Sequence, residues 1–413
     1  MDAADRRFRR AEVSTLWVLW LTYGAFYFCR TNLSAAVPGL EHDLGLTKTE
    51  IGWILGSFKV VYGVGQLVNG QIAERIGARR LLAIGMLGSA ALNVLFGLGA
   101  GFYFLLFVWA CNGYFQSLGW SPTMRVAANW FPPVRRGRAI AIIGTGYQLA
   151  GSLTFVVAGW SAEWLGWQGA VFVPAAVLTA SALYMLATLE ENPATALERT
   201  AAAAARPAAS WRANVAATLS NPRLWLLAIA LGLLNACRYG FLDWGISHLM
   251  EVQSASLGVS ALKYSILPFG GIAGTLLTGW ATDRFFGGRR VPVMIGSLVA
   301  LALLVLAYDA IVRTNAVASV LVLGAIGALI FGPQVLLVGT TPVDLARRGA
   351  AAAACGFVNF FGYLGAAAGD QMTGYLVDRS GWQAALWFWA ACALGAAIVV
   401  APLWRATARA EDA

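Results

Sequence analysis

The sequence predicts an all-α membrane protein in which twelve transmembrane helices form two pseudo-symmetric halves. Three observations predict this fold: the composition, the number of long apolar runs and an internal repeat. Of the 413 residues, 59% are hydrophobic and only 12% are charged, with a mean hydropathy of +0.67. Soluble domains carry about 25% charged residues. The composition therefore excludes a soluble enzyme, a disordered chain and a nucleic-acid-binding protein, because most of this chain cannot face water.

Each half of the chain contains six apolar runs long enough to cross a membrane, which takes roughly 20 residues per helix. The runs lie at about 14–38, 50–73, 80–99, 101–125, 138–161 and 167–189, then at about 223–250, 260–282, 291–312, 315–341, 349–376 and 382–404. We expect an N-terminal six-helix bundle over 1–189, a cytoplasmic linker that is a plain spacer over 190–222, and a C-terminal six-helix bundle over 223–413.

The positions of lysine and arginine predict the orientation of these helices. Of the 29 such residues, 21 lie in the N-terminus, the even-numbered loops, the linker and the C-terminus. By the positive-inside rule these segments are cytoplasmic, so we expect a multi-pass protein of the cell (inner) membrane with both termini in the cytoplasm. The basic N-terminus precedes a long apolar run without a clear cleavage site, which predicts a retained first helix rather than a signal peptide.

Three matches at nearly constant offset indicate that the two halves are duplicates. Residues 159–170 (GWSAEWLGWQGA) match residues 374–385 (GYLVDRSGWQAA) at an offset of 215. The pair Cys29-Arg30 matches Cys237-Arg238 at an offset of 208, and a Gly-x-x-x-acid-Arg motif recurs at an offset of 209. Because six spans return the chain to its starting side, the halves are parallel repeats, an arrangement that places a transported substrate at their interface.

Two arginines within the spans are the strongest candidates for a functional site. A charge deep in a spanning helix costs roughly 2.5–3.5 kcal/mol and marks function by default. Arg30 and Arg238 each lie about 15 residues into their spans, near the membrane midplane, and the duplication places them on facing halves. Two guanidinium groups repel unless an anion joins them, and a phosphate suits two bidentate forks. The alternative is that each arginine pairs internally with a carboxylate, for example Arg238 with Asp243.

Further polar and aromatic side chains in the spans extend this candidate site. Lys59 either enlarges the anion site or pairs with an acid such as Asp370, and the sequence leaves both possibilities open. Asp243 and Asp370 are interpreted as gating or structural partners rather than substrate ligands. The other candidate substrate-binding side chains are amides and aromatic rings: Gln66, Asn69, Gln148, Tyr23, Tyr27, Tyr62, Trp120, Tyr147, Tyr239 and Tyr363.

The repeated Gly-x-x-x-acid-Arg motif is interpreted as a gating feature. It comprises Gly70, Glu74 and Arg75 in the second span and Gly279, Asp283 and Arg284 in the eighth, at the expected cytoplasmic ends. Glycine permits close helix approach, and the acid can pair with arginine or stabilise a neighbouring helix end. We expect the two motifs to form a conformational latch and to make no contact with substrate.

No sequence pattern predicts a metal, a cofactor or a catalytic centre. The five cysteines lie inside apolar runs without metal-type spacing, and His42 and His248 are far apart. There is no G-x-x-x-x-G-K-[ST] motif, so solute gradients rather than ATP are the expected energy source. The chain contains no catalytic constellation, and we expect no enzymatic activity.

Five segments resemble the organophosphate:phosphate antiporter family of the major facilitator superfamily, of the glycerol-3-phosphate and hexose-phosphate transporter type. They are YGAFYFCRTN from Tyr23, GWSP from Gly119, RYGFLDW from Arg238, GIAGTLLTGW from Gly271 and FGYLG from Phe361. The resemblance covers nearly the whole chain. It implies the major facilitator fold, phosphate binding by Arg30 and Arg238, and exchange for inorganic phosphate by rocking of the halves.

Three departures from the family pattern surround the two arginines. The resemblance carries over the tyrosines at Tyr23, Tyr27 and Tyr363. However, Tyr147 stands where the glycerol-3-phosphate transporters have a histidine, Gln66 replaces a lysine, and Thr31 replaces the lysine after the first arginine. The phosphate-binding pair is therefore kept, while the organic part of the substrate is left open.

We therefore expect a secondary active transporter that exchanges a phosphorylated organic anion for inorganic phosphate by alternating access. Its expected partners are these small anions and the lipid bilayer, with no nucleic acid, and we expect a monomer. One alternative is a proton-coupled carboxylate or sugar-acid carrier in which Asp243 or Asp370 titrates. Another is a transporter-like sensor of sugar phosphates.

Overall fold

The computed structural model describes residues 3–192, 211–346 and 351–404, and within these ranges it is helical without a β-strand. Every run predicted in the first half forms a helix or an interrupted helix. The six segments are α1 (Ala3–Phe26) with η1 (Tyr27–Cys29) and α2 (Leu33–Leu44); α3 (Lys48–Ile76); α4 (Ala78–Leu98); α5 (Phe102–Ser117) with α6 (Trp120–Trp130); α7 (Pro133–Leu165); and α8 (Gly169–Thr188).

The second half repeats this order of six segments. They are α11 (Pro222–Tyr239) with the π-helical η2 (Gly240–Trp244) and α12 (Gly245–Gln253); α13 (Leu257–Tyr264) with α14 (Ile266–Phe286); α15 (Val291–Val312); α16 (Ala316–Val335) with the π-helical η3 (Leu336–Thr340) and α17 (Thr341–Leu345); α18 (Ala351–Ser380); and α19 (Trp382–Val400) with η4 (Ala401–Leu403). Eight helical segments in the described part of the chain are long and apolar enough to cross a membrane.

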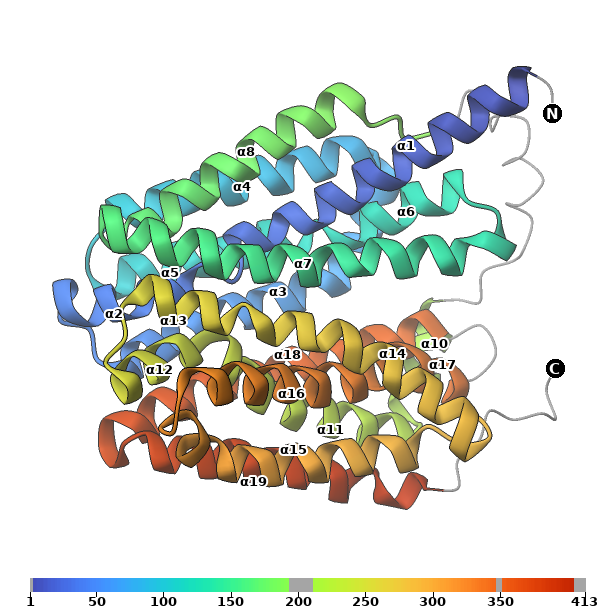
Figure 1. The fold of residues 1–413 in the computed structure, drawn as a ribbon. Helices are drawn as coiled ribbons and strands as arrows, with labels where there is room; N and C mark the ends of the chain where they lie inside the picture. Colours follow the sequence, from blue (N-terminus) through green and yellow to red (C-terminus); the bar gives the residue numbers. More distant parts are fainter. Residues whose placement is uncertain (1–2, 193–210, 347–350, 405–413) are drawn as a thin grey trace.

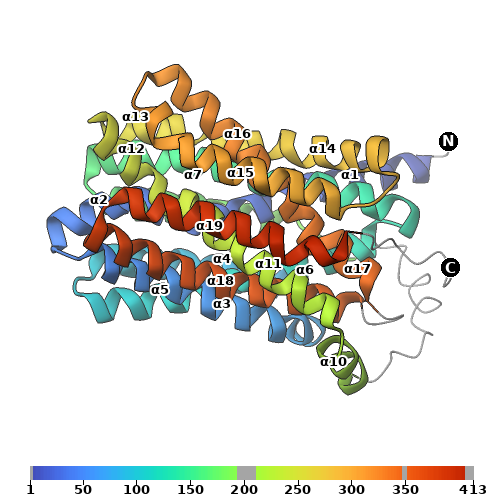
Figure 2. The ribbon, with the colours of Figure 1, turned by 90° about the horizontal axis from the view of Figure 1, so that it is seen from below.

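The two halves lie side by side as two groups of roughly parallel helices (Figures 1 and 2). We call the end of the bundle where α1 begins and α19 ends the terminal end, and the opposite end the distal end. The loops that follow α2, α4, α7 and α12 all lie at the distal end (Figure 1). This arrangement agrees with an even number of crossings in each half.

The segment between the halves contains a helix that the sequence did not lead us to expect. Helix α10 (Trp211–Leu219) lies inside the range predicted to be a plain spacer and packs beside α11 and α18. The indole of Trp225 in α11 donates a hydrogen bond to the carbonyl oxygen of Leu219 at 2.9 Å, which ties the two helices together. The first part of the predicted linker, 193–210, lies outside the described residues.

Two pairs of corresponding segments are interrupted in both halves. The first and seventh change conformation at η1 and η2, and the fourth and tenth break between α5 and α6 and at η3. Single π-turns inside helices are frequent at functional sites, because they redirect the side chains around them. Arg30 follows η1 directly, and Arg238 lies two residues before η2, so each candidate ligand sits at an interruption of its helix.

Helices α3 and α18 form a close contact between the halves (Figure 2). Glycines on both helices allow it: a Cβ on Gly52 would lie 2.6 Å from the carbonyl oxygen of Asp370, and one on Gly374 would overlap that of Lys48. Helices α7 and α13, which correspond to α18 and α3 in the internal repeat, also meet closely. A Cβ on Gly159 of α7 would overlap the side chain of Ala261 of α13. The interface is therefore built from repeat-related glycines that bring backbones together, as in other membrane helix pairs.

At the distal end, each half caps a helix of the other half with a carboxylate. Asp378 of α18 accepts hydrogen bonds from the backbone N–H groups of Lys48 and Thr49 at 3.2 and 2.7 Å, and from the Thr49 hydroxyl at 2.6 Å. Glu163 of α7 accepts one from the backbone N–H of Gly258 at 2.5 Å. Helix N-termini favour negative charge, so both contacts hold the distal ends of the halves together.

These two caps are related by the internal repeat. Glu163 and Asp378 occupy the same place in the matched segments 159–170 and 374–385, four residues after Gly159 and Gly374. The helices that they cap, α13 and α3, also correspond to each other in the two halves. A Gly-x-x-x-acid pattern thus supplies both the close backbone approach and the capping charge at each contact.

The close approach at Gly374 can be tested by adding a single methyl group. We expect Gly374→Ala to lower the thermal unfolding midpoint of the purified protein, because overpacking a tight contact costs about 1–3 kcal/mol. Gly356→Ala, on the same helix with open space around it, should be neutral or slightly stabilising, since alanine favours helices. Equal midpoints for the two variants would show that α3 and α18 do not meet at Gly374.

Candidate functional site

Arg30 and Arg238 are both buried, with exposed fractions of 8% and 5%. Neither forms an ion pair with any carboxylate among the described residues. The Nε and Nη2 atoms of Arg30 and the Nε atom of Arg238 are buried and have no hydrogen-bond partner. Unpaired buried charges and donors are costly. The two guanidinium groups are therefore buried charges without a carboxylate partner in the described part of the chain.

Aromatic rings surround the Arg30 guanidinium. Its Cζ atom lies 4.0 Å from the centroid of Tyr62, 5.0 Å from that of Tyr27 and 5.8 Å from that of Phe58. Rings near a cation offer their negative faces and partly replace the hydration that the charge loses on burial. The rings stabilise the guanidinium without neutralising it, so its net charge remains available to a ligand.

Arg238 is placed in the same way on the opposite half. Its Cζ atom lies 4.8 Å from the centroid of Tyr239 and 4.8 Å from that of Phe331 in α16. Phe331 escaped the sequence-based prediction, because a single phenylalanine in an apolar run carries no distinguishing signal. The two arginines thus share an aromatic setting as well as their repeat-related positions.

A chain of tyrosines connects the two arginines across the halves. The ring of Tyr62, next to Arg30, lies 4.6 Å from that of Tyr363, which in turn lies 6.3 Å from that of Tyr239, next to Arg238. On the other side, Tyr27 stacks on Tyr147 at 5.1 Å. The site is therefore lined by phenol groups from both halves, which offer hydroxyls and apolar faces to a ligand.

Lys59 pairs with both candidate acids, Asp243 and Asp370. Its Nζ atom donates hydrogen bonds to Oδ2 of Asp243 at 2.5 Å and to Oδ2 of Asp370. The side chains are 4%, 6% and 0% exposed, respectively. Of the two possibilities that the sequence left open for Lys59, the structure shows the ion pair. Because Asp243 pairs with Lys59, the structure does not show the alternative in which Arg238 pairs with Asp243.

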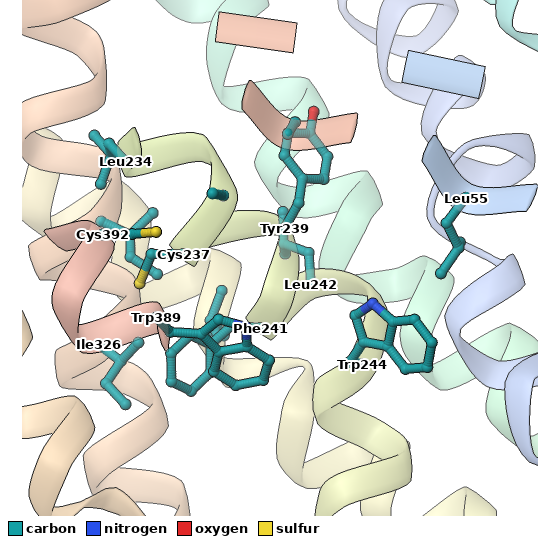
Figure 3. Close-up of a cluster of buried hydrophobic side chains, with 14 of the residues drawn as sticks. Leu55, Leu234, Cys237, Tyr239, Phe241, Leu242, Trp244, Ile326, Trp389 and Cys392 are labelled. Carbon is teal, nitrogen blue, oxygen red and sulfur yellow. The ribbon is translucent and has the colours of Figure 1, made fainter. Parts of the chain in front are cut away.

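The π-helical turn η2 holds Asp243 and Trp244 toward α3 while its other residues pack into the C-terminal half. The Phe241 ring packs at a tilted angle against Trp389, with 4.7 Å between the centroids, and Figure 3 shows Trp244 on the side of Leu55 of α3. A Cβ on Gly240 would overlap the indole of Trp389, so only glycine allows this turn to approach α19. Burial against Trp389 therefore fixes the segment that carries Asp243.

The remaining predicted ligands lie around the aromatic cluster. Tyr23 contacts Trp120 at 4.8 Å and Tyr147 at 6.2 Å between ring centroids. The Gln66 amide donates hydrogen bonds to the Tyr62 hydroxyl at 3.0 Å and the Ser117 carbonyl at 3.3 Å, which leaves it supporting Tyr62. The buried Gln148 has an amide nitrogen without a hydrogen-bond partner, so it keeps a free donor for a ligand.

The predicted latch residues are only partly described. The side chains of Glu74 and Arg75, with the surroundings of Gly70, lie outside the described residues. In α14, Asp283 and Arg284 are exposed, and a Cβ on Gly279 would meet open space. The role of this motif as a latch therefore stays a prediction.

The distal caps Glu163 and Asp378 were missed as functional residues, although the repeat contained the signal. Both lie inside the matched segments that established the duplication, as acids at the same repeat position. The described part of the chain contains no cluster of His, Cys, Asp or Glu that could hold a metal ion.

The ion cluster around Lys59 predicts a specific pattern of stability. We expect Lys59→Met to lower the free energy of unfolding by about 3–5 kcal/mol, because it leaves two buried carboxylates without a counter-charge. Adding Asp243→Asn and Asp370→Asn to Lys59→Met should recover most of the loss. Thermal unfolding of the purified variants measures both effects, and a triple variant less stable than Lys59→Met would refute the ion-pair account.

Comparison with known proteins places the chain in a family. It matches the Major Facilitator Superfamily over residues 19–369. It is 29% identical to the glycerol-3-phosphate transporter of Bacillus subtilis (strain 168), over 100% of this chain and 96% of that protein. It is also 28% identical to a probable hexose phosphate transport protein of Chlamydia trachomatis (98% and 94%) and 27% identical to the membrane sensor protein UhpC of Escherichia coli K12 (92% and 89%).

Solved structures agree on the fold. A bacterial homolog of the human lysosomal transporter Spinster, inward-facing and unoccupied, is similar with a TM-score of 0.72 at 16% identity, covering 96% of each chain. The nucleoside transporter NupG is similar with a TM-score of 0.75 at 15% identity, covering 95% of this chain and 100% of that one. The predicted all-α fold is confirmed, and this is a family of multi-pass membrane transporters rather than enzymes. The chain belongs to the Major Facilitator Superfamily.

Proposed function

We infer that this chain is a secondary active transporter of a phosphorylated organic anion and that it binds the phosphate group between Arg30 and Arg238. The observation that carries this inference is the pair of buried guanidinium groups, one in each half, with free nitrogen donors and no carboxylate in ion-pair contact among the described residues. A phosphate monoester supplies the missing charge and several acceptor oxygens. The similar proteins described above, which include transporters of glycerol-3-phosphate and hexose phosphate, support it.

The aromatic and amide side chains around the arginines are proposed to contact the organic part of the substrate. Four rings line the N-terminal half of the cluster, those of Tyr23, Tyr27, Trp120 and Tyr147. In the same half, the amide nitrogen of Gln148 is a free hydrogen-bond donor. Tyr239 and Tyr363 line the C-terminal half. Hydroxyl groups can bind sugar or glycerol hydroxyls, so this lining suits a small polyol phosphate better than an apolar anion.

The transport cycle is proposed to be an exchange for inorganic phosphate by alternating access. The hydrogen bonds from Asp378 and Glu163 join the halves at the distal end, and the exposed Asp283 leaves the latch motif of α14 disengaged at the terminal end. With both termini in the cytoplasm, as the positive-inside rule predicts, this is an inward-facing arrangement in the inner membrane. The protein would act as a monomer, since each half completes the site of the other.

The arginine pair can be tested by substitutions that keep the charge. We expect Arg30→Lys and Arg238→Lys each to reduce phosphate binding and uptake at least tenfold, because lysine lacks the planar fork that holds a phosphate at two points. Uptake of a labelled phosphate ester into proteoliposomes loaded with inorganic phosphate measures the effect. Arg313→Lys, at an exposed distal-end arginine, is the matched control and should transport normally. Normal binding in both site variants would show that the phosphate lies elsewhere.

The exchange itself predicts which gradient drives uptake. Proteoliposomes loaded with inorganic phosphate should accumulate labelled glycerol-3-phosphate or a hexose phosphate, and unloaded vesicles should not, even with an imposed pH gradient. Rapid uptake of a carboxylate driven by the pH gradient alone would instead favour the proton-coupled carboxylate carrier. Binding of the phosphate ester with no uptake under either condition would favour a sensor.

A further inference from the structure

We propose that the buried cluster of Lys59, Asp243 and Asp370 is a proton-binding site, and that it takes up a proton when a dianionic phosphate binds at the arginines. The proposal rests on the proposed function, because it assigns a second ligand, a proton, to the same binding region. The ligand of the cluster is H⁺ from water. The proton adds to a carboxylate oxygen as an O–H bond, without oxidation or a leaving group.

The first argument is the excess of negative charge within the cluster. One ammonium faces two carboxylates, and the three side chains are at most 6% exposed. Carboxylates that share one buried site do not both ionise freely. Oδ2 of Asp370 accepts the hydrogen bond from Lys59, so an added proton would bond to Oδ1 of the same carboxylate.

The second argument is the set of groups that face Asp370 from the surrounding helices. Lys59 from α3 donates hydrogen bonds to Asp370 and to Asp243 from η2. The Tyr239 ring from α11 faces the Lys59 ammonium, and the indole N–H of Trp244 from η2 interacts with the Asp370 carboxylate. Lys59 is the one cation in ion-pair contact with Asp370 among the described residues. The state of the carboxylate therefore depends on how closely Lys59 approaches.

The third argument is that the charges come from different halves. Lys59 belongs to the N-terminal half, and both carboxylates belong to the C-terminal half. If the halves part along α3 and α18 during transport, the ammonium leaves with α3. Two carboxylates then remain together without a counter-charge, and protonation of one of them relieves their repulsion. Separation of the halves is thereby coupled to a proton.

The fourth argument is the total charge of the site with its substrate. Arg238 Cζ and Lys59 Nζ lie 4.8 and 4.5 Å from the centroid of the same Tyr239 ring, so the cluster adjoins the arginine pair. With both arginines, the five charges sum to one positive charge. A phosphate dianion changes this to one negative charge, and one added proton makes the loaded site neutral. Net charge within a membrane is costly, so binding of a dianion favours proton uptake.

Isothermal titration calorimetry of the purified full-length protein with inorganic phosphate tests this coupling. Titrations at pH 8 in two buffers of different ionisation enthalpy give the number of protons taken up per phosphate bound. We expect the wild type to take up about one proton more than Asp370→Asn, because the neutral amide removes the site. The protonation of phosphate itself cancels in this difference, since both proteins receive the same ligand.

Two controls keep the result interpretable. Asp344→Asn removes a carboxylate that pairs with Arg290 at the terminal end and should leave the proton number of the wild type unchanged. If Asp370→Asn does not fold, Asp243→Asn serves instead and should show the same reduction. Equal proton numbers for the wild type and a folded cluster variant would overturn the proposal and leave a purely structural ion cluster. Failure of the wild type to bind phosphate would refute the proposed function instead, so the two failures are distinguishable.

Discussion

The arrangement of this protein depends on one constraint, which is that a charge buried in an apolar helix bundle must find compensation. The five charged side chains of the candidate site lie at the contact between the two halves, and they differ in how their charge is compensated. Lys59 finds its counter-charges across the interface in Asp243 and Asp370. Arg30 and Arg238 find aromatic rings but no carboxylate in the described part of the chain. The first group is compensated by the protein itself, and for the second we propose that a bound anion supplies the compensation.

The internal duplication places one of the two arginines in each half. Each arginine lies at an interruption of the first helix of its half, so the anion of the proposed function would be held by both halves at once. The same duplication sets the contact between them, since α3 meets α18 as α13 meets α7, with a glycine at each close approach.

Much of this organisation could be predicted from the sequence, for identifiable reasons. Twelve long apolar runs predicted the helical segments. Charged residues are rare within these runs, which identified Arg30, Arg238 and Lys59 as candidate site residues. The partner of Lys59 was left open, because the choice between an anion and Asp370 depends on helix packing that the sequence does not encode locally. Phe331 was missed because an isolated ring in an apolar run carries no distinguishing signal, and helix α10 was missed because the linker shows no amphipathic pattern.

The acids at the helix ends show how far the repeat itself extends. The Gly-x-x-x-acid pattern occurs at the distal ends of α7 and α18, and again toward the terminal ends of α3 and α14. The distal pair caps the beginnings of α3 and α13, which are the segments that carry the terminal pair at their other ends. Asp283 of the terminal pair is exposed, so in this structure the repeated pattern joins the two halves at the distal end, through Glu163 and Asp378.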